Sequence, residues 1–79
     1  MTLETAKNQI PRGVYEHFKG NPYEVLAVAL HSETREPMVV YRALYGEYGV
    51  WVRPAAMWAE RVCRDGYDGP RFRLIKTLE

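Results

Sequence analysis

Short runs of β-favouring residues, most of them followed closely by glycine or proline, limit this chain to a fold built from short strands. The runs that we expect to form strands are residues 14–18, 23–31, 38–45, 50–53, 60–64 and 71–75. After the fourth run, Pro54 suits the first position of a helix and the next residues tolerate one, so a single helical turn is expected there. Five to six close strands with glycine turns predict a mostly β fold, either a small SH3-like barrel or a strongly bent antiparallel sheet.

Two of these runs carry further information about strand pairing. Residues 23–31 are apolar on both alternating faces, which is typical of a central strand that is covered on both sides. Between the last two runs, residues 65–69 hold two glycines in turn sequences. We therefore expect a terminal hairpin that pairs residues 60–64 with residues 71–75.

The length of the chain allows one domain. A chain of 79 residues buries only about 60 to 65% of the surface that its unfolded form exposes, which leaves no room for a second core. Residues 1–9 are polar and too few to form a stable helix alone. We therefore expect a flexible N-terminal tail over residues 1–9 and a single β domain over residues 10–79.

Several missing features indicate the cellular setting. The longest apolar run, Val25 to Leu30, is far shorter than the roughly 20 residues of a bilayer span. Polar residues interrupt residues 1–10, so this segment does not resemble a signal peptide. The single cysteine, Cys63, excludes an internal disulfide, which fits a reducing compartment. The sequence predicts a soluble cytoplasmic protein without membrane contact.

The charge balance and the few metal-ligating residues limit which partners and cofactors the chain can bind. Lys and Arg number 11 against 10 Asp and Glu, so nucleic-acid binding would need a local basic patch. Strand pairing could bring His17 and His31 together, but two histidines and a cysteine that we expect to be buried or inert do not make the usual structural zinc site. We predict no metal and no cofactor, since a phosphate-cradling glycine loop is also absent.

The neighbours His31, Ser32, Glu33 and Thr34 contain the residue types of a catalytic site. An enzyme could use His31 and Glu33 as acid and base. However, one loop cannot aim a nucleophile, a base, an orienting group and an oxyanion hole at the same atom. We favour a structural role, in which Ser32 or Thr34 satisfies backbone groups of a turn.

Aromatic residues interleaved with arginine suggest a binding surface, because rings stack on nucleic-acid bases and also hold proline-rich peptides. In a small domain, large aromatic side chains must also build the core, and this is the role that we expect for Tyr41, Trp51 and Trp58. Tyr45 and Tyr48 flank a turn, where exposure is expected, and they are the better ligand candidates.

Seven sequence blocks, in order, resemble a bacterial family of short proteins known as domain of unknown function 1653. The blocks are residues 15–20, 23–26, 31–34, 40–41, 44–46, 51–54 and 70–72, and the resemblance extends from Gly13 to Ile75. It implies a small β-rich fold and a bacterial cytoplasmic setting, but no activity. It also implies a shared pocket matched by polar residues of these blocks: His17, Lys19, His31, Ser32, Glu33, Thr34 and Arg53.

The leading hypothesis is a non-catalytic binding module for a peptide or a single-stranded nucleic acid. Its groove is expected between the loop of residues 31–34 and the turn of residues 45–51. The candidate ligand-binding residues are His17, His31, Ser32, Glu33, Thr34, Tyr45, Tyr48, Trp51 and Arg53. The alternatives are a small enzyme or nucleotide-pocket protein that uses His31 and Glu33, and a structural homodimer that covers an exposed sheet edge.

Overall fold

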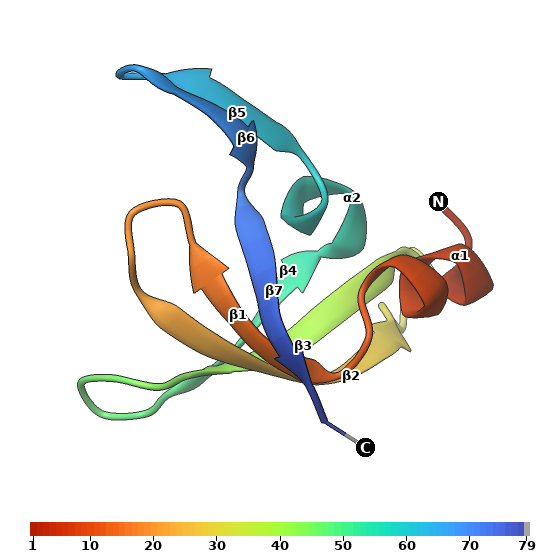
Figure 1. Cartoon of the computed structure of the whole chain (residues 1–79). Coiled ribbons are helices and arrows are strands. Elements are labelled where there is room, and N and C mark those ends of the chain that lie inside the picture. The colour runs from red at the N-terminus through yellow and green to blue at the C-terminus, as the bar shows by residue number, and fades with distance from the viewer. Residues whose placement is uncertain (79) are drawn as a thin grey trace.

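The computed structural model describes residues 1–78. Its elements, in chain order, are α1 (Leu3–Gln9), β1 (Gly13–His17), β2 (Pro22–Leu30), β3 (Pro37–Ala43), β4 (Val50–Pro54), α2 (Ala55–Trp58), β5 (Arg61–Arg64), β6 (Tyr67–Pro70) and β7 (Phe72–Thr77). Five strands form an antiparallel sheet in the order β4-β3-β2-β1-β7, and β5 pairs with β6 in a separate two-stranded ribbon (Figure 1). The mostly β fold class is confirmed.

The sheet is strongly bent but does not close into a barrel. Strands β4 and β7 are its two edges, and they do not pair with each other within residues 1–78. Of the two predicted architectures, the bent sheet with one helical turn after β4 is the one observed. Seven strands are present in place of the expected five to six, because the segment after α2 forms a ribbon of its own.

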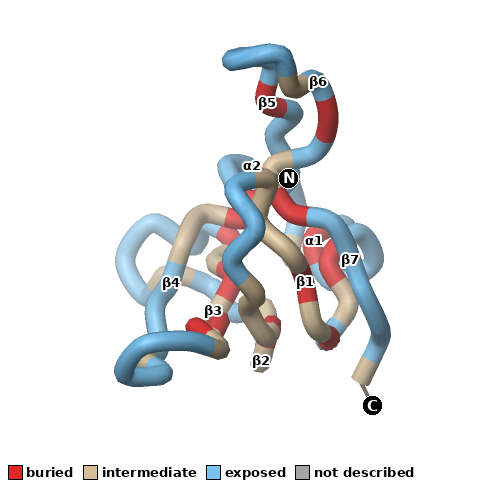
Figure 2. The backbone as a smooth tube through the Cα atoms, turned by 60° about the vertical axis from the view of Figure 1, so that its left-hand side comes forward, coloured by how far each residue is buried: buried red, intermediate tan, exposed pale blue. Residues whose placement is uncertain are grey.

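Both helices lie on the inner side of the bend, where they close one core. Residues of α1 and α2, such as Ala6 and Trp58, share a buried cluster with Tyr15, Val25 and Tyr41 of the sheet. We call the side of the sheet that carries these residues the inner face. In Figure 2 the buried stretches run through β1 and β3, whereas the first part of β4 is exposed.

Strand β2 is central in the sheet, but only one of its faces is covered. Val25 is fully buried, whereas Ala27 and Ala29 are exposed, so the prediction of a strand covered on both sides is wrong. The pairing with β3 shifts between Val25 and Ala27, which leaves Leu26 as an extra, bulged residue. A bulge changes which residues face inward, and this defeats an argument from simple alternation.

The predicted terminal hairpin is also wrong in its pairing. Arg64 pairs with Tyr67 across a two-residue turn whose central residues, Asp65 and Gly66, have φ angles of 53° and 80°. Left-handed backbone at both central positions of an Asp-Gly pair is typical of the tightest hairpin turn. The ribbon therefore ends at Pro70, and β7 is free to pair with β1 in the main sheet.

Residues 3–9 form helix α1, which packs against the core. Thr2 begins α1, and its hydroxyl accepts a hydrogen bond of 3.1 Å from the Thr5 backbone N–H. Ala6 and Ile10 are buried in the core, so packing stabilises a helix that is too short to persist alone. The division into a tail and a domain over residues 10–79 stays a prediction. No helix within residues 1–78 has the length and apolarity to cross a bilayer.

Candidate functional site

A cluster of aromatic rings surrounds His17 at one end of the inner face. His17 points to this side because it lies two residues beyond the buried Tyr15 in β1. Its ring centroid lies 5.0 Å from that of Phe72 and 6.4 Å from that of Tyr23. Phe72 in turn stacks on Trp58, with centroids 3.6 Å apart. The His17 ring therefore packs on aromatic rings that belong to the core.

One ring nitrogen of His17 is held by the local turn. The backbone N–H of Lys19 donates a hydrogen bond of 3.1 Å to Nδ1 of His17, so the neutral ring carries its proton on Nε2. Burial lowers the pKa of His17 below its ordinary value of 6.5, and Arg53, Arg71, Lys19 and Arg64 lower this pKa further. At neutral pH the ring is uncharged, and Nε2–H is a donor for a ligand.

Four cationic side chains from separate parts of the chain gather around His17. The Arg53 guanidinium carbon lies 5.5 Å from the centroid of Phe72. Arg64 lies 5.2 Å and Lys19 5.9 Å from the centroid of Phe18. Arg71 pairs with Glu60 at 3.1 Å, and its buried Nε has no hydrogen-bond partner among the described residues. The chain is nearly neutral as a whole, yet this region is locally basic.

Two tyrosines border the cluster on the side of the β3–β4 turn. The hydroxyl groups of Tyr23 and Tyr45 are 2.5 Å apart, and their rings meet edge to face. Burial and then the hydrogen bond with Tyr45 raise the pKa of Tyr23 to about 12. The Tyr23 hydroxyl is therefore a hydrogen-bonding group and not an anion at neutral pH. We name His17, Tyr23, Tyr45 and Arg53, with Lys19, Arg64 and Arg71, the aromatic–cationic face.

Exposed rings continue this face toward the tip of the turn. Tyr45 and Trp51 line a hollow of about 230 Å³, and Trp51 is 61% exposed. Tyr48, at the tip, has a φ angle of 58°, which an L-residue adopts only at some cost. Exposure of Tyr45 and Tyr48 is confirmed, as is burial of Tyr41 and Trp58. The expectation that Trp51 builds the core is wrong.

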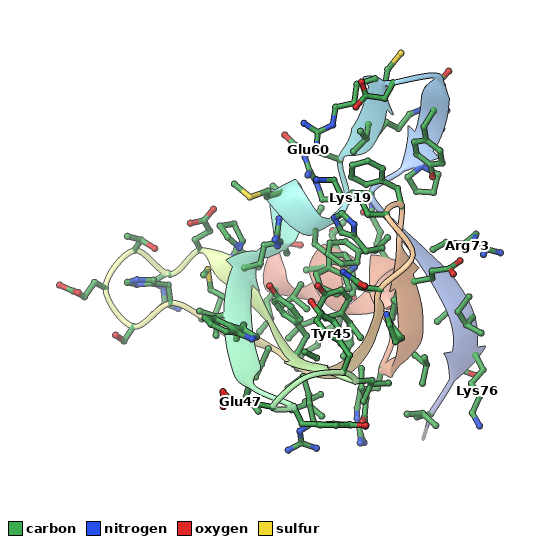
Figure 3. The ribbon with its side chains drawn as sticks, turned by 90° about the vertical axis from the view of Figure 1, so that its left-hand side faces the viewer. Lys19, Tyr45, Glu47, Glu60, Arg73 and Lys76 are labelled. Atoms are coloured by element: carbon green, nitrogen blue, oxygen red, sulfur yellow. The ribbon has the colours of Figure 1, made fainter. Side chains whose placement is uncertain are left out.

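Figure 3 shows how the cations are distributed around the sheet. Lys19 and Tyr45 lie on opposite sides of the ring cluster, whereas Arg73 and Lys76 project from β7 away from it. Arg73 instead forms an ion pair with Glu16 on the other face of the sheet. The two groups of cations therefore do not share a surface, and the β7 residues can serve as controls.

The loop of residues 31–34 lies far from this cluster along β2 and β3. Leu30 pairs with Pro37 at one end of the two strands, and Tyr23 pairs with Ala43 at the other end. The prediction of a groove between this loop and the turn of residues 45–51 is therefore wrong. The loop precedes β3 and the turn follows it, so they lie at opposite ends of this strand.

Hydrogen bonds within the loop support its structural role. Nδ1 of His31 accepts from the backbone N–H groups of Glu33 and Thr34, and Oγ1 of Thr34 accepts from the N–H of Glu36. Glu33 and Arg35 are exposed. The turn role expected of Thr34 is confirmed. The capping role of His31 was missed, although a histidine before polar turn residues is a usable signal.

The structure thus divides the candidate residues into two groups. The side chains of His17, Tyr45 and Arg53 gather around the rings of Tyr23 and Phe72, and Trp51 lies on β4 opposite Tyr41. His31, Ser32, Glu33 and Thr34 lie in the loop that follows Leu30, at the other end of β2. Sequence reasoning missed Arg64 and did not place Arg71 beside His17; the fold brings both arginines there. Cys63, expected to be buried or inert, is exposed. Within residues 1–78, no three metal-ligating side chains cluster.

A protein family and a solved structure are similar to this chain. A family described as protein of unknown function (DUF1653) matches residues 13–74. A crystal structure of a Bordetella bronchiseptica protein, described as belonging to DUF1653, is similar to this chain with a TM-score of 0.81 and 34% identity, over 91% of this chain and 95% of that one. No curated protein matches the chain. The resemblance inferred from the seven sequence blocks is confirmed.

Proposed function

This chain belongs to DUF1653, a family of proteins of unknown function, and we propose that it is a non-catalytic module that binds single-stranded nucleic acid on its aromatic–cationic face. One observation carries the proposal. Lys19, Arg53, Arg64 and Arg71 surround one histidine beside rings that are open to solvent. Proteins that bind single-stranded nucleic acid commonly combine cations along the phosphate backbone with aromatic rings that stack on the bases.

Each part of the face has a distinct role in this proposal. Lys19, Arg53 and Arg64 contact phosphate oxygens, since they form none of the ion pairs found within residues 1–78. Tyr45 and Trp51 stack bases. The neutral His17 donates a hydrogen bond from Nε2 to a phosphate or base acceptor.

A proline-rich peptide is the weaker candidate for this face. Such peptides dock on aromatic grooves and do not require a group of cations. The four cations around His17 favour a polyanion instead. We do not extend the proposal to catalysis by His31 and Glu33, because Nδ1 of His31 already caps the turn. The cytoplasmic setting stays a prediction.

Fluorescence anisotropy with labelled ten-nucleotide RNA and DNA of the same mixed sequence tests the proposal at low salt. The double variant Lys19→Gln, Arg53→Gln should weaken binding. The slope of log affinity against log salt should become less steep, by the amount that the loss of about two phosphate contacts produces. Trp51→Ala should weaken binding by about tenfold through lost stacking, with little change in the salt slope.

The matched control is the variant Lys76→Gln, which removes an exposed cation that lies on β7 away from the aromatic–cationic face. Its binding should equal that of the unmodified chain. The proposal is overturned if neither RNA nor DNA binds, or if Lys76→Gln weakens binding as much as the double variant does. Binding of a proline-rich peptide in place of both nucleic acids would assign the face to the peptide class.

A further inference from the structure

Strand β2 has a backbone edge that the sheet leaves unpaired. Strand β1 pairs with β2 only over Pro22 to Val25, whereas β3 pairs with β2 as far as Leu30. Within residues 1–78, no strand pairs with residues 26–30 on the side that β1 occupies. Helix α1 packs against β2 from the inner side of the sheet, and no backbone hydrogen bond within residues 1–78 joins it to residues 26–30. Backbone groups along such an edge are able to add another strand.

A hollow lies between this edge and the segment that leads from α1 to β1. Its volume is about 320 Å³, which falls in the range of ligand sites. Ile10, Leu26 and Val28 give it an apolar wall, and Lys7 and Arg12 provide cations. No acidic side chain of the described residues lines it. The hollow therefore offers an apolar contact and a positive charge next to unpaired backbone.

We propose that this hollow binds the C-terminal segment of an extended partner peptide. The peptide adds to the free edge of β2 in the position that a longer β1 would occupy, antiparallel to β2. The peptide then runs in the same direction as β1, and its C-terminus lies where β1 begins. Arg12 is at this point, because it directly precedes Gly13, which pairs with Val25. The terminal carboxylate binds Arg12 and Lys7, and an aliphatic side chain packs on Leu26 and Val28.

The backbone edge favours a peptide over a small aliphatic acid. A small acid satisfies the cations and the apolar wall, but it leaves the backbone groups of residues 26–30 to water. An extended chain satisfies all three features with a ladder of main-chain hydrogen bonds. The site is also separate from the aromatic–cationic face, which lies around the other end of β2 at Tyr23.

Anisotropy with a fluorescein-labelled heptapeptide that ends in Thr-Val-Ile tests this proposal. The peptide with a free carboxylate should bind at least about tenfold more tightly than the same peptide with a C-terminal amide. The double variant Lys7→Gln, Arg12→Gln should remove this preference, whereas Lys76→Gln should keep it. In amide NMR spectra, the shifts on binding should map to residues 26–30 and to α1.

Three results would overturn the proposal. The first is equal affinity for the heptapeptide with a free carboxylate and for its C-terminal amide. The second is amide NMR shifts that map outside residues 26–30 and α1, and the third is displacement of the peptide by hexanoate at equal concentration. The last result would make the hollow a small-molecule site. Arg53→Gln separates this test from the nucleic-acid proposal, since it should weaken oligonucleotide binding and leave peptide binding unchanged.

Discussion

The rings of Trp58 and Phe72 are stacked, with centroids 3.6 Å apart and planes 4° from parallel. Trp58 belongs to α2 and Phe72 to β7, so this contact joins the short helix to the edge strand that follows the ribbon. Arg53 lies over the same Phe72 ring, and His17 meets it edge to face. The stack therefore supports both the core and the proposed binding face.

Removing one ring of this stack should destabilise the whole domain. We expect Phe72→Ala to lower the free energy of unfolding by about 3–5 kcal/mol, because the change leaves a cavity beside Trp58. Urea unfolding followed by tryptophan fluorescence measures this loss. Leu74→Ala, on the same strand but 40% exposed, should cost far less. Equal losses for the two variants would contradict the role assigned to the stack.

Stability should depend on the protonation of His17. Its folded-state pKa is lowered, so the unfolded chain binds the proton more tightly than the folded chain does. The stabilisation is present above the ordinary pKa of 6.5 and is lost as the pH falls toward the folded-state pKa. His17→Gln should therefore reduce the difference in unfolding free energy between pH 7.5 and pH 5.

An NMR titration of the His17 ring protons gives the complementary measurement. The midpoint should lie below 6.5 in the free protein and should rise when an oligonucleotide is bound, because phosphates favour the charged ring. A midpoint at or above 6.5 in the free protein would contradict the local basic surroundings that we describe.

The buried hydroxyl of Tyr15 anchors the segment before β1. It donates a hydrogen bond of 2.7 Å to the carbonyl of Pro11, and burial raises the pKa of Tyr15 to about 12. Tyr15→Phe should lower the free energy of unfolding by about 1 kcal/mol through loss of this bond. Chemical denaturation checks this value. No change in stability would mean that water replaces the hydroxyl at Pro11.

The exposed edge strand β4 favours weak self-association. Val50, Trp51 and Val52 are each more than half exposed, and an apolar edge without lysine readily pairs with another strand. We expect the sedimentation coefficient to rise with protein concentration, and Val52→Lys to abolish this rise. The control Val50→Thr keeps a β-branched residue without adding charge. A sedimentation coefficient that stays at the value of a monomer at all concentrations would exclude the homodimer.

Local chemistry was enough to predict most strands. Gly20 and Pro22 ended the first strand close to the observed His17, and Pro54 preceded the predicted helical turn. These features depend on φ angles and on backbone donors that one residue gains or loses, so the sequence determines them directly. The turn role of Thr34 belongs to the same class, since its hydroxyl contacts a backbone group only two residues away.

Long-range pairing was beyond such reasoning. The Asp65–Gly66 turn indicates a hairpin, but it does not reveal that β7 pairs with β1, where Phe72 packs on Trp58. The bulge at Leu26 likewise changed which face of β2 is buried. Pairing of distant strands depends on the apolar surface that the complete core buries, and no local pattern records that quantity.

The candidate site shows the same division. The sequence by itself determined the residue types, namely a histidine, exposed turn aromatics and an arginine before Pro54. Only the tertiary structure decided that Arg64 and Arg71 join His17 while His31 lies at the other end of β3. The physical reason is that a basic patch is a sum of charges over distance in space, and folding sets those distances independently of separation along the chain.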